Sequence, residues 1–526
     1  MSSTAYARVP KTSGERKSRY DGKLVKNLSK IEPKKLGLGL VAGCCFVLLT
    51  YISLAKLFTI YSPVFASSTI TLSETLIVPK NDTTSNPESR VETKVSSEEE
   101  EAITDLAERN DFVKMEEISA NELEKKDIPQ LDEKLENKLT CDENSVDEGF
   151  PYARPVVCEM TGEVRISPKA SSVFFVDPKS PGDGQPERRV RPYARKDNFL
   201  LPGVHEVVLK TVPPGAAEAP VCAVNYNVPA VIFSVAGYTG NFFHDMADVL
   251  IPLFLTSSHF KGEVQYFVTN YKPWWIQKYS PVLKKLSNYE VINFDSDDRV
   301  HCFPHAFLGL IRDRDLIIYP HATRNPRNYS MVDFTRFLRG AYGLPKDSPV
   351  ALGLQPAKKP RMLIISRTGT RKLLNLNEVI AVSEELGFEV VVSEAGGDVA
   401  QFAKLVNSAD AMLAVHGAGI TNQIFLPTQA VMIQIVPWGK MDWMATNFYG
   451  QPARDMKLRY VEYYIEKEES TLIEKYPKDH LLFTNPLAVH GQGWTAIADT
   501  IMKQDVKINL WRFKPSLLEA LNLLQE

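Results

Sequence analysis

The sequence predicts an α/β protein in which two Rossmann-like domains face a cleft, preceded by one transmembrane helix and a stem. Three observations carry this prediction. Residues 36–54 run nineteen positions without a charge. Short β-rich runs alternate with segments of helical spacing between residues 141 and 356. The alternation restarts in residues 357–526, after a linker with two prolines and two lysines.

The N-terminal segment is predicted to anchor the chain in a membrane. Residues 1–35 form a basic tail with ten Lys or Arg against three acids, and residues 36–57 form the signal-anchor helix. A cleaved signal peptide is disfavoured by the long basic tail and by the lack of a small-residue cleavage site. Positive flanks stay cytosolic, and a short span suits the Golgi membrane. We therefore expect a single-pass type II Golgi protein with a luminal C-terminal bulk.

Residues 58–140 have the composition of a luminal, acidic and largely disordered stem. Between residues 62 and 140, acids outnumber bases nineteen to nine, which disfavours collapse. Residues 103–139 have some helical spacing, but Pro129 interrupts it. The net charge of −3 for the whole chain also argues against a nucleic-acid partner.

The folded part is predicted to hold two mostly parallel sheets covered by helices. In the first domain, strands are expected at residues 231–235, 264–268 and 290–294. In the second domain, strands are expected at residues 362–365, 388–392, 411–415 and 431–436, with helices at 377–386 and 399–408. The tail, residues 506–525, has helical spacing and is expected to pack back onto the first domain. In such sheets a ligand binds beyond the carboxyl ends of the strands.

Four cysteines fall in the predicted lumen, where disulfides form. Three pairings are possible, and Cys141 with Cys158 closes the shortest loop, which leaves Cys222 with Cys302. Four free buried thiols are the alternative. The sequons at Asn81 and Asn328 would be luminal glycosylation sites.

A glycine turn follows the strand at residues 411–415. Its residues are His416, Gly417, Ala418, Gly419 and, on the first turn of the next helix, Asn422. Glycine lets the backbone approach a ligand, and a helix N-terminus presents N–H groups to an anion. A nucleotide diphosphate fits this pattern. A tight structural turn with a hydrogen-bonded histidine explains it as well.

A basic loop follows another strand of the same domain. Arg367, Arg371 and Lys372 come directly after residues 362–365, where guanidinium groups could bind phosphates in bidentate fashion. A solvated surface loop is the alternative.

A third cluster ends the strand at residues 231–235 in the first domain. His244 and Asp248 share a helix face because they are four residues apart, and Asp245 lies one position round. Any of the three could take a proton from a hydroxyl. Alternatively, Asp245 has only a structural role, as an acid that stabilises a helix N-terminus capped by Asn241.

Two metal-like motifs are judged to be structural, so no metal site is expected. Asp295 and Asp297 form a D-x-D pattern, but they lie away from the phosphate-binding candidates. His301 and His305 have ligand spacing, yet Pro304 prevents a helix there.

The stretches GYTGNFFHDMADVLIPLF, VHGAGITNQIFLP, VPWGKMDWMATNFYGQPARDM and YIEKEESTL resemble the plant branch of glycosyltransferase family 61, which includes xylan arabinosyl- and xylosyltransferases. The resemblance extends from about Cys141 to the C-terminus. It implies a GT-B fold and an inverting Golgi enzyme that uses a UDP-pentose on xylan, most simply α-1,3-arabinofuranosyl transfer from UDP-arabinofuranose. β-1,2-Xylosyl transfer from UDP-xylose is the alternative.

By that resemblance, the glycine turn and the two arginines would hold UDP, and the His244 cluster would lie near the acceptor. We expect Asp245 to be the base, with His244 second, and activity that needs no metal cofactor. Four tryptophans are candidate sugar platforms: Trp274, Trp275, Trp438 and Trp443. A metal-dependent glycosyltransferase and a non-catalytic Golgi partner in polysaccharide synthesis are the two rival functions. A homo- or hetero-oligomer is compatible with each function.

Overall fold

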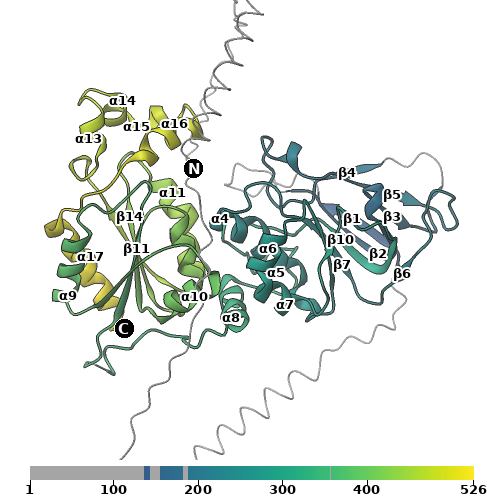
Figure 1. Cartoon of the computed structure of the whole chain (residues 1–526), viewed down its shortest axis with the longest axis horizontal. Coiled ribbons are helices and arrows are strands. Elements are labelled where there is room, and N and C mark those ends of the chain that lie inside the picture. Colours follow the sequence, from purple (N-terminus) through teal and green to yellow (C-terminus); the bar gives the residue numbers. More distant parts are fainter. Residues whose placement is uncertain (1–135, 143–154, 182–186, 356, 526) are drawn as a thin grey trace, which may run out of the picture. The chain divides into compact units, whose positions relative to one another are not determined.

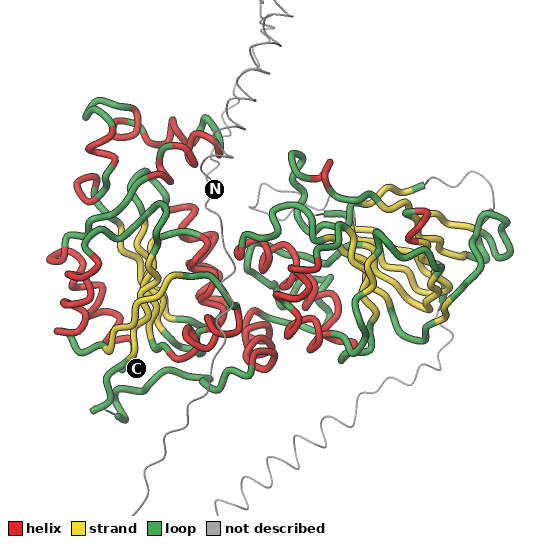
Figure 2. Tube along the Cα trace, viewed as in Figure 1, coloured by secondary structure: helices red, strands yellow, loops and turns green. Residues whose placement is uncertain are grey.

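The computed structural model describes residues 136–142, 155–181, 187–355 and 357–525. They form two β-sheets with flanking helices (Figures 1 and 2). Within these ranges, no helix combines the length and the apolar content needed to cross a bilayer. The predicted tail, the span at 36–57, most of the stem and the sequon at Asn81 lie outside the described residues.

The first sheet has ten described strands in the order β4-β5-β3-β2-β10-β7-β8-β9, with β1 beside β2 and β6 beside β10. Their bounds are β1 (Lys138–Asp142), β2 (Val157–Ser167), β3 (Ser172–Val176), β4 (Arg188–Val190), β5 (Val207–Val212), β6 (Val224–Asn225), β7 (Ala230–Ser234), β8 (Gln265–Thr269), β9 (Ile292–Asn293) and β10 (His301–Leu308).

This sheet is mixed, which corrects the expectation of a mostly parallel one. Strands β10, β7, β8 and β9 run parallel, whereas β2 pairs antiparallel with β1, β3 and β10. The reason is the connection between β2 and β3. It is the short turn Pro168–Ala170, and parallel neighbours need a much longer crossover.

Helices pack against the parallel part of the first sheet (Figure 1). They are α4 (Phe242–His244), α5 (Ile251–Ser257), α6 (Pro273–Lys278) and α7 (Ser280–Leu286), and helix α8 (Met331–Tyr342) packs on α7. The sheet residues on their side are apolar and fully buried, for example Val231 and Phe233 on β7. Ala230 and Ile232 point to the opposite face, which is also buried. Strand β7 is thus buried on both faces, as its continuous apolar run predicts.

The second sheet is entirely parallel, which agrees with the predicted direction of its strands, and its strand order is β12-β11-β13-β14-β15, where β15 was not predicted. Its strands are β11 (Arg361–Ser366), β12 (Glu389–Glu394), β13 (Ala411–Val415), β14 (Val431–Val436) and β15 (Arg459–Tyr464). Its helices are α9 (Leu376–Glu385), α10 (Val399–Ser408), α11 (Asp442–Ala445), α12 (Gln451–Asp455), α13 (Leu472–Lys475), α14 (Leu481–Thr484), α15 (Pro486–His490), α16 (Trp494–Asp499) and α17 (Leu510–Leu523). Helices α9 and α17 lie on one face of this sheet and α10 on the other (Figure 1).

The C-terminal helix α17 packs on the second sheet and not across to the first domain, which corrects that expectation. Its buried side chains, Phe513, Leu517 and Ala520, join the core formed with α9, β14 and β15. They are spaced four and three residues apart, so they form one apolar stripe, and the second sheet offers the matching face.

One hydrophobic core links the helices of the first sheet to those of the second. It includes Phe254 and Phe334 from α5 and α8, and Phe402 and Phe425 from the second half. Helix α8 contacts both α7 and α10, and both sheets belong to one compact unit of the chain. The pocket described below therefore has walls from both sheets.

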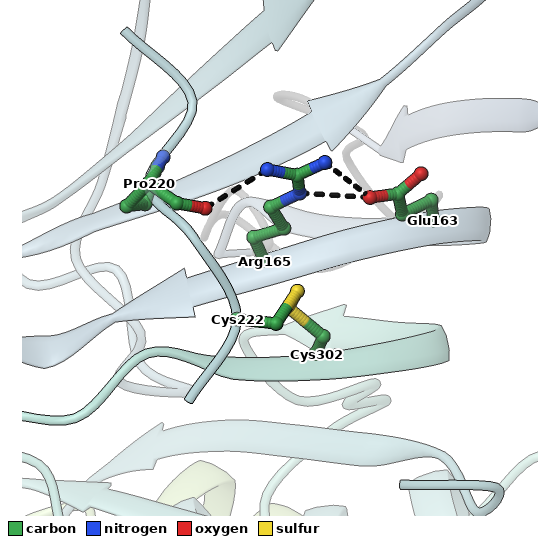
Figure 3. The surroundings of a disulfide bond; sticks show 5 residues. All are labelled: Glu163, Arg165, Pro220, Cys222 and Cys302. Carbon is green, nitrogen blue, oxygen red and sulfur yellow. Dashed lines mark hydrogen bonds and ion pairs between the residues drawn. A yellow bond between two sulfur atoms is a disulfide. The ribbon is translucent and has the colours of Figure 1, made fainter. Parts of the chain in front are cut away.

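Both predicted disulfides are present, Cys141 with Cys158 and Cys222 with Cys302. The first joins β1 to β2. The second ties the segment before β6 to β10, beside Arg165, which bonds to Glu163 and to the Pro220 carbonyl (Figure 3). Asn328 is exposed, with a left-handed φ of 55°, in the turn before α8, so its sequon is accessible.

Candidate active site

The turn after β7 is held by a glycine and a capping asparagine. Gly237 has φ of 60°, and a Cβ there would lie 2.4 Å from the Tyr193 ring, so no larger residue fits. Asn241 caps α4 by accepting from the Phe243 N–H, as expected. The chain then continues as a π-helix over Asp245–Leu250, a form that is frequent at functional sites.

Asp245 is fully buried, and its carboxylate is saturated by hydrogen bonds. Oδ1 accepts from the Gly240 N–H and from Trp275 Nε1, each at 2.9 Å. Oδ2 accepts from Tyr279 Oη at 2.6 Å and from Lys278 Nζ at 3.3 Å. A carboxylate with four donors and no exposed surface fixes the turn and α6, and it is poorly placed to receive a proton from a substrate.

Asp248 is also fully buried, and it orients His244. Its Oδ2 lies 2.9 Å from His244 Nδ1, which confirms that the two residues share one face. The same oxygen accepts from Tyr193 Oη at 2.8 Å, and Arg195 pairs with Oδ1 at 2.8 Å. Because the carboxylate accepts a hydrogen bond from Nδ1–H, Nε2 of the neutral histidine carries a lone pair. No described residue bonds Nε2, and the side chain keeps 18% of its surface exposed.

Asp248 stays ionised because of its cationic neighbours. Burial alone would raise the pKa of this carboxyl, but the Arg195 charge, the His244 hydrogen bond and the Arg312 charge outweigh burial and lower it. Arg195 and Arg312 also both pair with Asp315. This group of two acids and two arginines balances its own charge inside the first half of the molecule.

The turn after β13 brings bare backbone to the end of the second sheet. Gly417 has φ of 147°, and a Cβ there would lie 2.9 Å from an Arg367 guanidinium nitrogen and 3.3 Å from one of Arg371. The helix predicted to follow this turn is a 3₁₀-helix, Ala418–Phe425. The Asn422 amide donates to the Gly419 carbonyl, an oxygen that an α-helix would use for its own ladder.

Arg367 and Arg371 lie together over this turn, as predicted. Among the described residues, no carboxylate is within ion-pair distance of either guanidinium. Arg367 Nε donates to the Thr370 carbonyl at 2.8 Å, while the buried Nε of Arg371 has no acceptor in the described part. Burial lowers the pKa of both, and burial together with the Arg367 charge takes the pKa of Arg371 to about 10. Two buried like charges with spare donors form a site for an anion.

His416 is buried beside these arginines and is neutral. Burial first, then the Arg371 and Arg367 charges, lower its pKa to about 3. Its ring packs edge-to-face on Tyr449 with centroids 5.3 Å apart. The histidine therefore brings hydrogen-bonding capacity to the site without adding a third positive charge.

A cavity of about 360 Å³ opens at the carboxyl ends of β11, β12 and β13. Three of the predicted glycine-turn residues line it, Ala418, Gly419 and Asn422, together with Arg367. Gly240 and Phe242, from the turn after β7, form the opposite wall. The two predicted turns are thus walls of one pocket.

Sequence reasoning missed two parts of the pocket. Lys278, the last residue of α6, lines the wall and also pairs with Asp245, and no local pattern singles it out. Glu394 at the end of β12 and the following residues 395–397 line the pocket as well, and the glycine pair so soon after a strand could have indicated a third turn. Arg195 and Arg312, which balance Asp248, come from distant loops.

Several predicted residues lie elsewhere. Lys372 faces Asp505, at 3.5 Å between Nζ and the carboxylate, and like Arg371, His416 and Gly417 it is not one of the residues that line the cavity. Trp275 is fully buried, so it is no sugar platform, and Trp438 is largely buried beside Gln504. Trp274 and Trp443 are about half exposed. Trp443 packs on Phe448, which contacts Phe243 next to His244.

The two metal-like motifs are occupied by protein contacts: His301 lies 3.2 Å from Asp297, and His305 lies 3.0 Å from Glu159. Asp295 accepts from the Tyr271 N–H and lies 2.9 Å from His205, while Asp297 accepts from Arg299. Among the described residues, no group of three or more His, Cys, Asp or Glu is arranged to hold a metal.

The anion site lies at the carboxyl ends of parallel strands, in a pocket lined by residues from both halves of the molecule. Such an arrangement suits an enzyme that binds a nucleotide sugar. The chain belongs to glycosyltransferase family 61, whose model, described as Glycosyltransferase 61, matches residues 242–433. That segment begins at the helix that follows the first turn and contains His244, the turn after β13 and both arginines.

Three relatives from Oryza sativa subsp. japonica are similar over most of the chain. A beta-1,2-xylosyltransferase is 57% identical, with all of both chains covered. An alpha-1,3-arabinosyltransferase is 50% identical over 72% of this chain and 67% of its own. A second beta-1,2-xylosyltransferase is 42% identical over 76% of this chain and 88% of its own.

Proposed function

We propose that this enzyme transfers xylose from UDP-xylose to the xylan backbone through a β-1,2 linkage, with inversion at the anomeric carbon. The similarity to a beta-1,2-xylosyltransferase along the full length of both chains supports this choice. The sequence analysis put α-1,3-arabinofuranosyl transfer first. The matches to arabinosyltransferases cover less of the chain, so the comparisons favour xylosyl transfer.

One observation carries the donor site: Arg367 and Arg371 lie over Gly417, and among the described residues no carboxylate is within ion-pair distance of either. A UDP diphosphate supplies the missing charge and accepts from both guanidinium groups. The neighbouring cavity, lined by Gly419 and Asn422, then holds the rest of the nucleotide sugar. A donor at the strand ends of the second sheet and an acceptor on the first is the GT-B-like arrangement, which we adopt here.

The geometry moves our choice of base from Asp245 to His244. Asp245 has four donors on its carboxylate, whereas His244 has a free Nε2 and an ionised partner at Nδ1. In the proposed step, His244 Nε2 takes the proton of the acceptor hydroxyl while that oxygen bonds to the anomeric carbon. The bond from the anomeric carbon to the UDP oxygen breaks, and UDP leaves on the opposite face. Asp248 stabilises the histidinium that forms.

In this proposal, fixed cations stabilise the negative charge on the departing UDP. Arg367 and Arg371 already point at Gly417 before UDP binds, so little reorganisation is needed during the reaction. We therefore propose that turnover needs no metal cofactor. We also propose the predicted setting: a Golgi type II protein with its catalytic part in the lumen.

The acceptor would bind along aromatic side chains near His244. Tyr238 stacks on the His244 ring with centroids 4.4 Å apart, and Trp443 extends the row through Phe448. The flat faces of pyranose rings pack well on such side chains. A xylan chain lying on them would present one hydroxyl to Nε2.

The test is to incubate the purified full-length chain with UDP-xylose, UDP-arabinofuranose and other UDP-sugars, using xylo-oligosaccharides as acceptors. The product linkage and anomeric configuration are then read by NMR. We expect β-1,2-linked xylose from the α-linked donor. Transfer from UDP-arabinofuranose alone would overturn the choice of sugar, and a product of retained configuration would overturn the single displacement.

A further inference from the structure

A chain of hydrogen bonds behind the pocket holds His416 in one orientation. His416 follows β13, Gln434 lies on β14 and Tyr460 on β15, so three neighbouring strands supply the three groups. Gln434 Nε2 lies 2.7 Å from His416 Nδ1, and Tyr460 Oη donates to Gln434 Oε1 at 2.6 Å. Gln434 is fully buried, and His416 nearly so.

This chain determines which histidine nitrogen carries the proton. Because Gln434 Oε1 accepts from Tyr460, its amide nitrogen is the group that faces His416. An amide nitrogen only donates, so Nδ1 must accept with its lone pair. A neutral imidazole has one proton, which therefore resides on Nε2.

We propose that Gln434 is a positioning residue: it fixes His416 as the Nε2–H tautomer, so that the ring donates to the donor diphosphate alongside Arg367 and Arg371. This inference rests on the proposed function, because it takes the anion in the pocket to be a nucleoside diphosphate.

The surroundings of His416 favour a donor at Nε2. The charged or titratable groups around it are the two guanidinium groups and the hydroxyl of Tyr449. No described residue accepts from Nε2, and Arg371 Nε also has no acceptor there. The arginines keep the ring uncharged by lowering its pKa to about 3. The two guanidinium groups and the Nε2–H all donate, so a bound anion is an acceptor that they can share.

A glutamine suits this task better than a glutamate. A carboxylate at position 434 would accept from Nδ1–H and so select the opposite tautomer, with a lone pair at Nε2 facing the anion. It would also raise the pKa of the ring, so acid would add a proton to Nε2 and restore the donor. Tyr460 and Glu462 on β15 would face the new charge as well; burial and the Glu462 charge already raise the pKa of Tyr460.

The experiment measures binding of UDP to the full-length chain by calorimetry, at about pH 8 and about pH 6. Gln434→Glu should weaken UDP binding about 10- to 100-fold at the higher pH, the loss of one hydrogen bond to a charged group. Most of that loss should be recovered at the lower pH. UDP itself gains a proton between these pH values, but this affects both proteins equally and cancels in the ratio of their dissociation constants. A pH-independent loss would overturn the proposal.

A matched control is Gln265→Glu, at a buried strand glutamine of the first sheet that bonds only to backbone carbonyls. It should lower the melting temperature as a buried charge does, without a pH-dependent change in UDP affinity. Equal pH dependence in this control would also overturn the proposal.

A double-mutant cycle separates positioning from a general structural effect. His416→Phe should weaken UDP binding about 10-fold or more, and Gln434→Leu should do nearly the same. If Gln434 acts through His416, Gln434→Leu should have no further effect in the His416→Phe background. Additive losses would contradict the proposal. If the unaltered chain bound no UDP, the proposed function itself would fail, which is a different outcome from normal UDP binding by Gln434→Leu.

Discussion

The two turns that meet at the pocket handle charge in opposite ways. After β7, the acids Asp245 and Asp248 are buried with Lys278, Arg195 and Arg312, so the charges balance within the protein. After β13, Arg367 and Arg371 are buried, and in the described part of the chain no carboxylate is within ion-pair distance of either guanidinium; the nearby Glu394 charge acts only on Arg367. The charges of the first turn are balanced without a ligand, and Asp248 holds His244 in one orientation.

This difference assigns different tasks to the two turns. A balanced network is rigid and presents a lone pair on His244 to a neutral hydroxyl group. An unbalanced pair of cations costs free energy until an anion arrives, so binding energy is available for the donor and for departing UDP. Five predictions test the comparison, from the largest effect to the smallest.

His244→Ala should lower kcat by about 10²- to 10⁴-fold, because it removes the proposed general base. UDP binding should be unchanged, since the histidine belongs to the other turn. Steady-state kinetics with calorimetry for UDP measures both quantities. Asp245→Asn serves as the comparison: it should reduce thermal stability more than His244→Ala, because Asp245 has four donors to satisfy. Wild-type kcat in His244→Ala would remove this residue from the mechanism.

Arg371→Leu should weaken UDP binding by about 100-fold, the effect of losing charge-assisted hydrogen bonds to a diphosphate. Its free energy of unfolding should stay within about 1 kcal/mol of the parent or rise, because a buried like charge is removed. Calorimetry and thermal melts give the two values. A strongly destabilised variant would mean that Arg371 has a structural partner and that the second turn is balanced after all.

Asp248→Asn should destabilise the fold by about 3 kcal/mol or more, because Arg195 and Arg312 lose a buried counter-charge. The pKa of Asp248 is lowered in the folded chain, so its stabilising contribution is present above the unfolded pKa of about 4 and is lost as pH falls further. Chemical denaturation at several acidic pH values measures this. The parent should lose stability more steeply than the variant below about pH 4, and parallel curves would count against an ionised Asp248.

Trp443→Ala should raise the KM for xylo-oligosaccharides a few-fold, about 1 kcal/mol, with little change in the KM for UDP-xylose. Trp511→Ala is a suitable control, because this tryptophan is highly exposed on α17, away from both turns. Acceptor titrations with both variants decide the matter. Equal KM values for Trp443→Ala and the parent would remove the aromatic row from the acceptor site.

Treatment with EDTA should leave turnover unchanged, within about two-fold, if the arginines supply the charge that meets departing UDP. The assay is repeated with added Mn²⁺ or Mg²⁺, which should have equally little effect. Loss of activity with chelator and recovery with metal would show that the cations of the second turn are insufficient alone.

The second sheet could be predicted closely from the sequence, and so could strands β7, β8 and β9 of the first sheet, but the antiparallel part of the first sheet could not. Strands β13 and β14 and helix α10 begin and end at the predicted residues, since each is a clean apolar or amphipathic run between turn residues. The first sheet is mixed in direction, and strand direction depends on connection lengths that residue patterns record poorly. The disulfide pairing was predicted because the shortest loop closes most readily.

For the candidate site, the sequence alone determined the residue types at each strand end: glycines, arginines, a histidine and paired acids. Only the tertiary structure decided which charges are balanced, because the partners of Asp248 come from loops some fifty or more positions away in the chain. Spacing can place His244 and Asp248 on one face, but it cannot show that Asp245 is enclosed by Trp275 and Tyr279. Burial and counter-charge are properties of the packed chain, and they determine which of three neighbouring groups can accept a proton.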